Sequence, residues 1–378
     1  MKIAIVCESV FPESKGGLER WMVWLANNLS RKERIVFYLN ASGVNEVRNG
    51  VVYKSITNKS WSYTKKNTRG ILQSIDFSRK LFIQLKKIDY EVIYSAQAPV
   101  ISLLFIKMAN FKPKKSLLII EWLEIWSYSY WQEYLGRIFG LLGYLIQFIA
   151  LRVGEVKVCF TDRVYGKLKR FSKESHIYKL PGICMENTPN FPVSFRQKDD
   201  IIFLSRFVKE KNPILAIDTV VEYKKLGWNG VFFLIGSGPM ESEIKDYVNH
   251  KSASNFVKVL VNIPDFEVTE IMKSSFVLLH TSIREGFGLS MVEAACHGVP
   301  TILINSPENA SVDLAIIEEL VSQTATVSEL VGKLQQAYTN QGIYHGKLKI
   351  WIESIYPQML GSKSLTHIER IIKNNYDS

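Results

Sequence analysis

The sequence is poor in cysteine and contains no acidic metal-binding motif. Its four cysteines, Cys7, Cys159, Cys184 and Cys296, are widely spaced, and none belongs to a Cys-x-x-Cys pair. This usage is typical of reduced thiols in a cytoplasmic chain, not of a disulfide framework or a zinc site. No Asp-x-Asp motif occurs, and no His, Asp and Glu residues have the spacing of metal ligands. We therefore expect a cytoplasmic protein that binds no metal.

Long hydrophobic runs are absent as well. The longest apolar segment, residues 138–151, has 14 residues, whereas a membrane-spanning helix needs about 20. The N-terminus enters a strand-like pattern at once and lacks the layout of a signal peptide. We expect neither a spanning helix nor a secretory leader.

Acidic residues are scarce in the first half of the chain. Residues 1–190 contain 29 Lys and Arg against 15 Asp and Glu, whereas the remainder contains 18 against 21, and the whole chain carries a net charge of +11. A basic half is suited to anionic lipid head groups, although a solubilising basic surface is the competing interpretation. No nucleic-acid-binding motif accompanies the charge, so we expect no nucleic acid partner.

The 378 residues predict two domains, and an apolar content of 47% is ample for their cores. In the second half, strand-like apolar runs alternate with helical stretches that begin near Asn212, Met240, Asp265, Leu289 and Val312. Such alternation indicates a parallel sheet covered on both faces. The first half shows the same alternation, including a basic helix over residues 71–88. Pro, Gly and Asn interrupt residues 177–200, so we place the hinge near residue 190.

The most informative stretch is residues 276–300. An apolar strand is followed by a turn with Gly286 and Gly288 and by a helix that starts at Leu289. Free backbone N–H groups at such a helix start form an anion site. Glu285 and Glu293 flank this anion site. Because carboxylates repel phosphate, the two glutamates are suited to hydroxyl groups that lie on either side of a bound phosphate. This arrangement fits a sugar, a diphosphate and a ribose in line; an ordinary strand–helix turn with surface glutamates is the alternative.

The run Arg-Glu-Gly-Phe-Gly-Leu-Ser-x-x-Glu-Ala at residues 284–294 resembles the signature of the retaining glycosyltransferases of family 4, which have the GT-B fold. The resemblance implies that Glu285 contacts the donor sugar and that Glu293 contacts the nucleotide ribose. It also implies that the diphosphate meets backbone amides between them, at Gly286, Phe287, Gly288 and Leu289.

Three other segments resemble the same family. Arg206 and Lys211 match its diphosphate-binding pair, and their side chains are suited to phosphate oxygens. Gly236 matches a strand-ending turn that borders the nucleotide. Gly16 and Gly17 match the first glycine loop, which faces the sugar-phosphate of the donor.

Residues 121–136 contain three tryptophans and three tyrosines. Aromatic faces suit sugar rings, so this segment is either an acceptor wall or an aromatic edge of the core. Relatives in the family commonly carry a histidine where this chain has Leu123, and the difference leaves open any role of that histidine beside the donor sugar.

The predicted protein is thus an α/β protein with the GT-B fold, in which two Rossmann-like parallel-sheet domains face each other across a cleft. We expect an acceptor-binding domain at residues 1–190, a nucleotide-sugar-binding domain at 191–345, and a segment at 346–378 whose helix crosses back to the first domain. The resemblance implies a metal-independent, retaining hexosyltransferase that uses no cofactor beyond its nucleotide-diphosphate-sugar donor.

The expected acceptor is a glycan or a lipid-linked molecule, in cell-surface polysaccharide or glycoconjugate synthesis, with peripheral contact to an anionic membrane at its inner face. The alternatives are a nucleotide-sugar epimerase of the same fold and a non-catalytic nucleotide-sugar-binding subunit.

Overall fold

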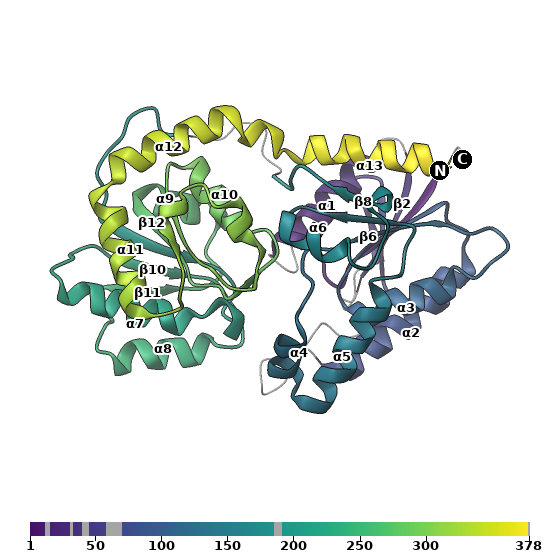
Figure 1. The fold of residues 1–378 in the computed structure, drawn as a ribbon, viewed down its shortest axis with the longest axis horizontal. Coiled ribbons are helices and arrows are strands. Elements are labelled where there is room, and N and C mark those ends of the chain that lie inside the picture. Colours follow the sequence, from purple (N-terminus) through teal and green to yellow (C-terminus); the bar gives the residue numbers. More distant parts are fainter. Residues whose placement is uncertain (12–15, 31–32, 40–44, 58–69, 185–190, 377–378) are drawn as a thin grey trace. The chain divides into compact units, whose positions relative to one another are not determined.

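The computed structural model describes residues 1–11, 16–30, 33–39, 45–57, 70–184 and 191–376 (Figure 1). The chain forms two compact units. Unit 1 comprises Met1–Met185 and Met359–Ser378, and unit 2 comprises Glu186–Gln358. Among the described residues, no helix combines the length and the apolar character that crossing a membrane requires.

Unit 1 is built on one sheet with the strand order β3-β4-β2-β1-β5-β6-β7-β8. Only the β3–β4 pair is antiparallel among its described pairings. The central strands are almost wholly buried, as expected for parallel strands covered on both faces. The strands are β1 (Lys2–Val6), β2 (Arg34–Leu39), β3 (Asn45–Arg48), β4 (Val51–Ser55), β5 (Val92–Ala96), β6 (Leu117–Glu121), β7 (Val156–Cys159) and β8 (Ile177–Lys179).

The α-helices of unit 1 include the last one of the chain. They are α1 (Gly17–Leu29), α2 (Ile71–Lys87), α3 (Val100–Ala109), α4 (Tyr128–Leu135), α5 (Arg137–Ala150), α6 (Asp162–Leu168) and α13 (Gly361–Tyr376). The Ser364 hydroxyl of α13 donates to the carbonyl of Gly182 (2.5 Å) and accepts from its amide (3.2 Å). Gly361 lies so close to the Trp21 ring of α1 that a Cβ there would be 2.9 Å from it. The C-terminal helix therefore completes the core of unit 1.

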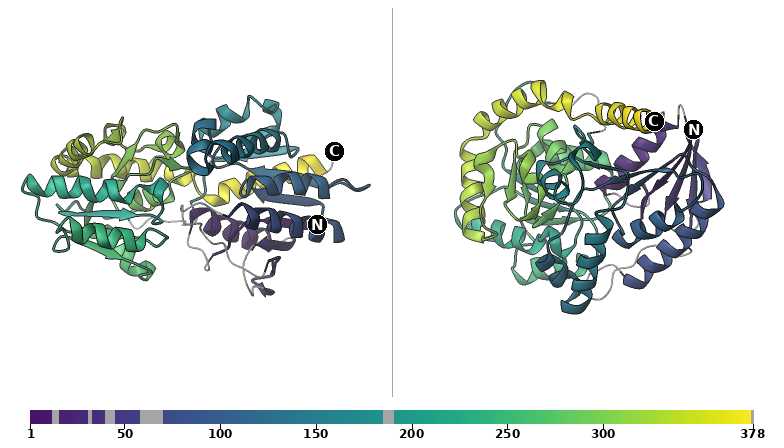
Figure 2. Two further views of the ribbon diagram at one scale, coloured as in Figure 1. Left: turned by 90° about the horizontal axis from the view of Figure 1, so that it is seen from below. Right: turned by 45° about the vertical axis from the view of Figure 1, so that its right-hand side comes forward.

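Unit 2 contains a six-stranded parallel sheet with the order β11-β10-β9-β12-β14-β16, and helices cover both of its faces (Figure 2). Its strands are β9 (Asp200–Leu204), β10 (Phe232–Ile235), β11 (Val257–Leu260), β12 (Ser275–His280), β14 (Thr301–Ile304) and β16 (Val321–Ser322). Its helices are α7 (Pro213–Lys225), α8 (Glu241–His250), α9 (Asp265–Ser274), α10 (Leu289–Cys296), α11 (Val327–Thr339) and α12 (Gln341–Ser354).

The expected helix near Val312 is wrong. Residues Ala310–Leu314 form only a 3-10 turn, and the next α-helix, α11, begins at Val327. The side chain of Asn309 accepts a hydrogen bond from the Ser311 amide and so caps this single turn. Such a local side-chain bond competes with helix propagation.

One strand and one domain boundary also differ from the expectation. Within the interrupted segment 177–200, Ile177–Lys179 forms the edge strand β8, whose partner is β7. Three residues are too few to show a hydrophobic period, so only the pairing with β7 reveals this strand. The expected boundary at residue 345 falls inside α12, all of which belongs to unit 2.

The aromatic segment at residues 121–136 contributes mainly to the core of unit 1. Trp122 and Trp131 are buried, whereas Trp126 is half-buried and donates its indole N–H to Glu124 (2.7 Å). Tyr128 is exposed. Of the two interpretations of this segment, a core edge therefore accounts for two of its three tryptophans.

Candidate functional site

The candidate site lies at the carboxyl end of the sheet in unit 2. The adjacent parallel strands β10, β9 and β12 end there, and each is followed by a predicted site residue. Gly236 follows β10, Arg206 follows β9 by two residues, and Glu285 lies beyond β12 in the short strand β13 (Arg284–Glu285). Ligands of open parallel sheets bind at this edge.

A close backbone approach explains the glycine at position 236. A Cβ on Gly236 would lie 1.9 Å from the carbonyl oxygen of Ser205, in the loop after β9. No side chain fits at that separation, so the loops after β9 and β10 pack directly against each other.

A second glycine shapes the turn between β13 and α10. Gly288 has φ 82° and ψ 53°, in the left-handed region that favours glycine, and a Cβ there would lie 2.8 Å from Cβ of Ser311. Gly288 is also the N-cap of α10, so this helix begins without a side-chain cap. The first amides of a helix that has no cap are suited to an anionic ligand.

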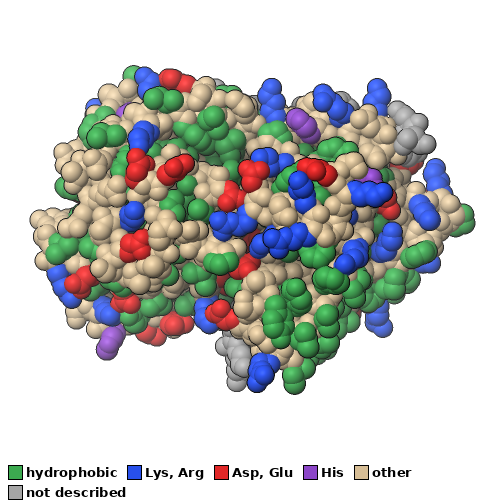
Figure 3. All heavy atoms as spheres, in the orientation of Figure 1, with side chains coloured by type: hydrophobic (Ala, Val, Ile, Leu, Met, Phe, Trp, Pro, Cys, Tyr) green, Lys and Arg blue, Asp and Glu red, His purple; other side chains and the backbone are tan. Residues whose placement is uncertain are grey.

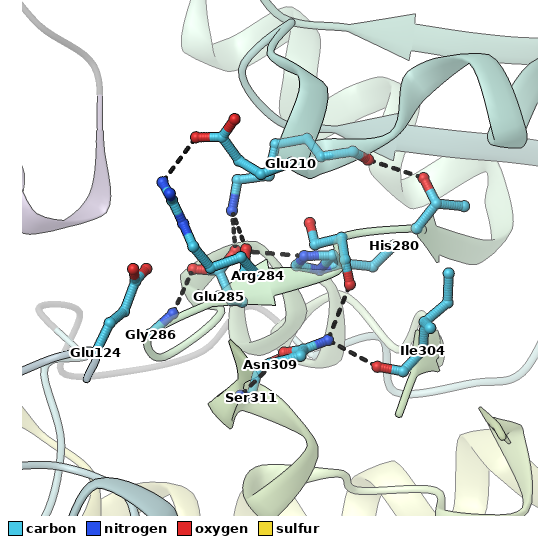
Figure 4. A network of polar contacts seen from close by, with 12 residues as sticks. Glu124, Glu210, His280, Arg284, Glu285, Gly286, Ile304, Asn309 and Ser311 are labelled. Atoms are coloured by element: carbon cyan, nitrogen blue, oxygen red, sulfur yellow. Dashed lines mark hydrogen bonds and ion pairs between the residues drawn. The ribbon is translucent and has the colours of Figure 1, made fainter. Parts of the chain in front are cut away.

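Lys211 and Glu285 form the centre of the site. Figure 4 shows Glu285 with Glu210, His280 and Arg284 around it. Lys211 Nζ lies 2.5 Å from Glu285 Oε2 and 3.2 Å from the carbonyl oxygen of Arg284. Burial is the largest single effect and raises the pKa of Glu285, but Lys211, His280 and Arg206 together outweigh it, and the pKa falls to about 2. Burial lowers the pKa of His280, which is 3.4 Å from Glu285, to about 4. At neutral pH Glu285 is therefore ionised and His280 is neutral.

A buried ion pair holds this centre in place. Arg284 donates to Glu210 (2.7 Å), and the amide of Ile283 donates to the Glu210 carbonyl (3.0 Å). Burial raises the pKa of Glu210, but Arg284, a backbone hydrogen bond and Arg206 together outweigh it, so its pKa lies below the usual value. These contacts tie the 3-10 turn Lys209–Lys211 to the segment that carries Glu285.

Asn309 connects the loops beneath Glu285. Its Nδ2 donates to the carbonyls of Ser282 (3.1 Å) and Ile304 (2.9 Å), and its Oδ1 accepts from Ser311 (Figure 4). The strand β15 (Glu308–Asn309) also pairs in parallel with β13. The buried amide thus fixes the position of β13 relative to β14.

The predicted residues of the second domain all lie in unit 2. Among them, the structure brings Lys211 and Glu285 into direct contact and places Arg206 where its charge acts on Glu285. Glu293 is partly exposed on α10. Gly236 lies in the turn after β10. Gly286, Phe287 and Gly288 connect β13 to α10, and Leu289 is the first residue of α10.

Gly16 and Gly17, the predicted glycine loop of the first domain, lie at the start of α1 in unit 1.

Sequence reasoning assigned no role to four polar residues of the site, namely Glu210, His280, Arg284 and Asn309. Position was a signal for two of them, because Glu210 directly precedes Lys211 and Arg284 directly precedes Glu285. Charged neighbours of site residues are usually solvated, so the pairing of Glu210 with Arg284 follows only from the fold.

The site offers anion-binding and hydroxyl-binding groups side by side. Arg206 and Lys211 provide positive charge near the start of α10, and the ionised Glu285 is a hydrogen-bond acceptor. Among the residues that the structure describes, no group of three or more His, Cys, Asp or Glu side chains is placed to hold a metal ion. The arrangement is thus suited to a ligand that combines phosphate with hydroxyl groups.

Residues 185–355, which include the whole site, match the family model of the group 1 glycosyl transferases. Two curated relatives match parts of the chain. One, a phosphatidylinositol N-acetylglucosaminyltransferase component of Arabidopsis thaliana, is 23% identical, over 57% of this chain and 52% of its own length. The other, the alpha-monoglucosyldiacylglycerol synthase of Acholeplasma laidlawii, is 30% identical, over 38% of this chain and 39% of its own length. The chain thus spans about half or less of these relatives.

Solved structures match the chain over its full length. The sucrose-phosphate synthase of Thermosynechococcus elongatus has a TM-score of 0.78 at 15% identity, covering 100% of this chain and 99% of its own. Anabaena HepE in complex with UDP-glucose has a TM-score of 0.75 at 14% identity, covering 99% and 100%. These likenesses confirm the predicted GT-B fold with two Rossmann-like parallel-sheet domains.

Proposed function

We propose that the protein is a glycosyltransferase that moves a sugar from a nucleotide-diphosphate donor to a glycan or lipid-linked acceptor. The observation that carries the proposal is the Lys211–Glu285 pair, at 2.5 Å, beside the uncapped start of α10. It lies in the segment that matches the group 1 glycosyl transferases. A carboxylate and a cation fixed at one point suit the junction between a sugar and a diphosphate.

The chemistry follows from these groups. The bond between the anomeric carbon and the diphosphate oxygen breaks, and negative charge develops on the leaving diphosphate. Lys211 and Arg206 stabilise this charge, which is the kind of electrostatic contribution that dominates many enzymes. The ionised Glu285 accepts a hydrogen bond from a sugar hydroxyl, and Glu293 accepts one from the ribose.

The acceptor oxygen forms the new bond on the face that the diphosphate leaves. The departing phosphate, which lies on the same face as the acceptor, takes the proton of the acceptor hydroxyl. The anomeric configuration is thereby retained.

A lipid-linked acceptor at the inner face of the membrane accounts best for the charge of the chain. The names of two relatives refer to phosphatidylinositol and to a glucosyldiacylglycerol, and the basic excess of this chain lies in residues 1–190. In the basic helix α2, Arg79, Lys86 and Lys87 are exposed. Lys65 and Lys66, which belong to the same basic stretch, lie outside the described residues. Contact with anionic lipid would bring the protein to such an acceptor.

Binding and turnover of nucleotide sugars test the function. A thermal-shift screen of uridine, guanosine and adenosine diphosphate sugars should show one donor class that raises the melting temperature, because a ligand that binds only the folded state stabilises it. The same donor should be hydrolysed slowly without acceptor, and NMR of the transfer product should show the donor's anomeric configuration. Epimer formation, or binding without any turnover, would contradict the proposal.

We expect activity to survive chelation of divalent metals. Arg206 and Lys211 already supply positive charge for the diphosphate, so a bridging cation is not needed. Initial rates of donor hydrolysis should agree within about twofold with and without EDTA, since no metal contribution to leaving-group stabilisation is lost. Complete loss of turnover in EDTA that magnesium or manganese restores would overturn the metal-independent mechanism.

A further inference from the structure

The helix α5 of unit 1 packs with its small residues inward and its large apolar residues outward. Its buried positions are Gly140, Gly143, Gln147 and Ala150. A Cβ on Gly143 would lie 2.4 Å from the ring of Trp131, so the helix lies directly against α4. This arrangement reverses the usual one, in which a surface helix buries its large apolar side chains.

The outward face of α5 carries a continuous apolar stripe, which we call the outer stripe: Ile138, Leu142, Leu145 and Ile149. These residues recur at helical spacing and are 75%, 49%, 46% and 54% exposed. Phe139, Leu141 and Phe148 border the stripe and are also exposed. Figure 3 shows hydrophobic side chains gathered over the part of unit 1 to which α5 belongs. An exposed apolar surface of this continuity marks an interaction site.

The charges around the stripe select its partner. Arg137 and Arg152 lie at the two ends of α5, and no Asp or Glu lies between them. Glu155, the next acidic residue along the chain, is paired with Lys107 (3.6 Å). A symmetric contact between two copies through α5 would therefore oppose arginine to arginine, with no acid on the helix to compensate. A bilayer with anionic head groups accommodates both the stripe and the arginines.

We infer that α5 lies in the plane of a membrane surface and inserts the outer stripe into the boundary between head groups and acyl chains. This deepens the membrane contact proposed above by assigning it to one helix and to apolar insertion in addition to charge. It does not depend on glycosyl transfer.

The buried face of α5 connects the inserted helix to the sheet. The side chain of Gln147 accepts a hydrogen bond from the amide of Trp126 (3.1 Å) and donates one to its carbonyl (2.8 Å). Trp126 belongs to the segment that follows the carboxyl end of β6. Insertion of α5 thus holds this edge of unit 1 at the level of the head groups, where the hydroxyl of a lipid-linked acceptor lies.

A fluorescent label tests the insertion directly. The four native cysteines are buried, so Leu142→Cys accepts a polarity-sensitive maleimide dye selectively. Phe266→Cys, on the exposed surface of α9 in unit 2, is the control. With vesicles of 30% phosphatidylglycerol in phosphatidylcholine, the label at residue 142 should shift to shorter wavelength and be quenched by spin-labelled lipid. The label at residue 266 should not change.

Charge substitutions give a second readout. The double variant Phe139→Glu/Leu142→Glu should lower the vesicle partition coefficient at least about tenfold, because two apolar side chains are replaced by charges that stay in water. The double variant Leu226→Glu/Phe266→Glu changes the same residue types at exposed positions of unit 2 and should change partitioning by less than about twofold. Donor hydrolysis without vesicles should be equal in both variants, since neither touches the donor site.

The outcomes separate the insertion of α5 from the membrane contact under Proposed function. If the protein binds vesicles but the label at residue 142 stays in water, the assignment to α5 fails and the membrane contact stands. If the protein does not bind these vesicles, both the assignment to α5 and the membrane contact fail. A dimer in solution that the Phe139→Glu/Leu142→Glu variant dissociates, without vesicle binding by the parent protein, would show that a second copy covers the stripe and would overturn the inference.

Discussion

Replacing Lys211 by alanine is expected to reduce sugar transfer by about 10²–10³-fold in kcat/KM, the usual effect of removing one preorganised group that stabilises developing charge. Lys211 Nζ lies 2.5 Å from Glu285 and its charge acts on that carboxylate. In the proposed mechanism the same charge also stabilises the leaving diphosphate. Initial rates of transfer at saturating acceptor would measure the effect. Circular dichroism and the melting temperature would show that the variant folds.

The same variant should acquire a pH dependence that the parent lacks. Burial raises the pKa of Glu285, and Lys211 is the foremost charge that lowers it to about 2. Without the ammonium the pKa of Glu285 must rise, so the residual activity, which needs the ionised carboxylate, should fall as the pH is lowered through the new pKa. The parent keeps Glu285 ionised over that range. A pH–rate profile with the same shape for both proteins would contradict this role of Lys211.

Lys209→Ala is the matched control for Lys211→Ala. Lys209 lies in the same 3-10 turn and is exposed, so the substitution removes the same charge from a solvated position. We expect its activity to stay within about twofold of the parent, because exposed charges contribute little. Equal losses in the two variants would mean that the net charge of the turn matters and not the Lys211–Glu285 contact.

Replacing Glu293 by alanine is expected to weaken the binding of the free nucleoside diphosphate by roughly tenfold to a hundredfold. Hydrogen bonds to a charged group contribute about 1.5–3 kcal/mol, and the variant would lose the bonds that we propose Glu293 makes to the ribose hydroxyls. Isothermal titration calorimetry would measure the affinity. Glu243→Ala, at an exposed position of α8, is the control and should bind as the parent does.

A deoxyribose analogue isolates the contact of Glu293. The parent should bind the analogue more weakly than the ribonucleotide, whereas Glu293→Ala should bind the two alike, because the interaction that distinguishes them is gone. Unchanged affinity of Glu293→Ala for the ribonucleotide would exclude a role in ribose binding. A loss of the same size for the ribonucleotide and the analogue would point to a distorted helix α10 and not to a missing hydroxyl contact.

Local patterns were sufficient for most of the elements around the site. The strand β12, the glycine turn and the helix α10 follow from an apolar run, from two glycines and from a helix stop at Gly298 and Pro300. The structure adds the reason for Gly288, which has a positive φ and lies too close to Ser311 for a Cβ. The helix expected near Val312 shows the limit of such local patterns. The apolar pattern continues there, but the side chain of Asn309 caps a single 3-10 turn.

The sequence by itself determined the alternation of strands and helices and the identity of the charged residues beside the glycine turn. Such features depend on period, on turn chemistry and on spacing, which are all local. Only the tertiary structure decided which charges meet: Glu210 and Arg284 are 74 positions apart and form a pair because β9 and β12 are neighbours in the sheet. It also decided the orientation of α5. An apolar helix with three small residues can bury either of its faces. The ring of Trp131 leaves room only for glycine at position 143, so α5 buries the face that carries the small residues.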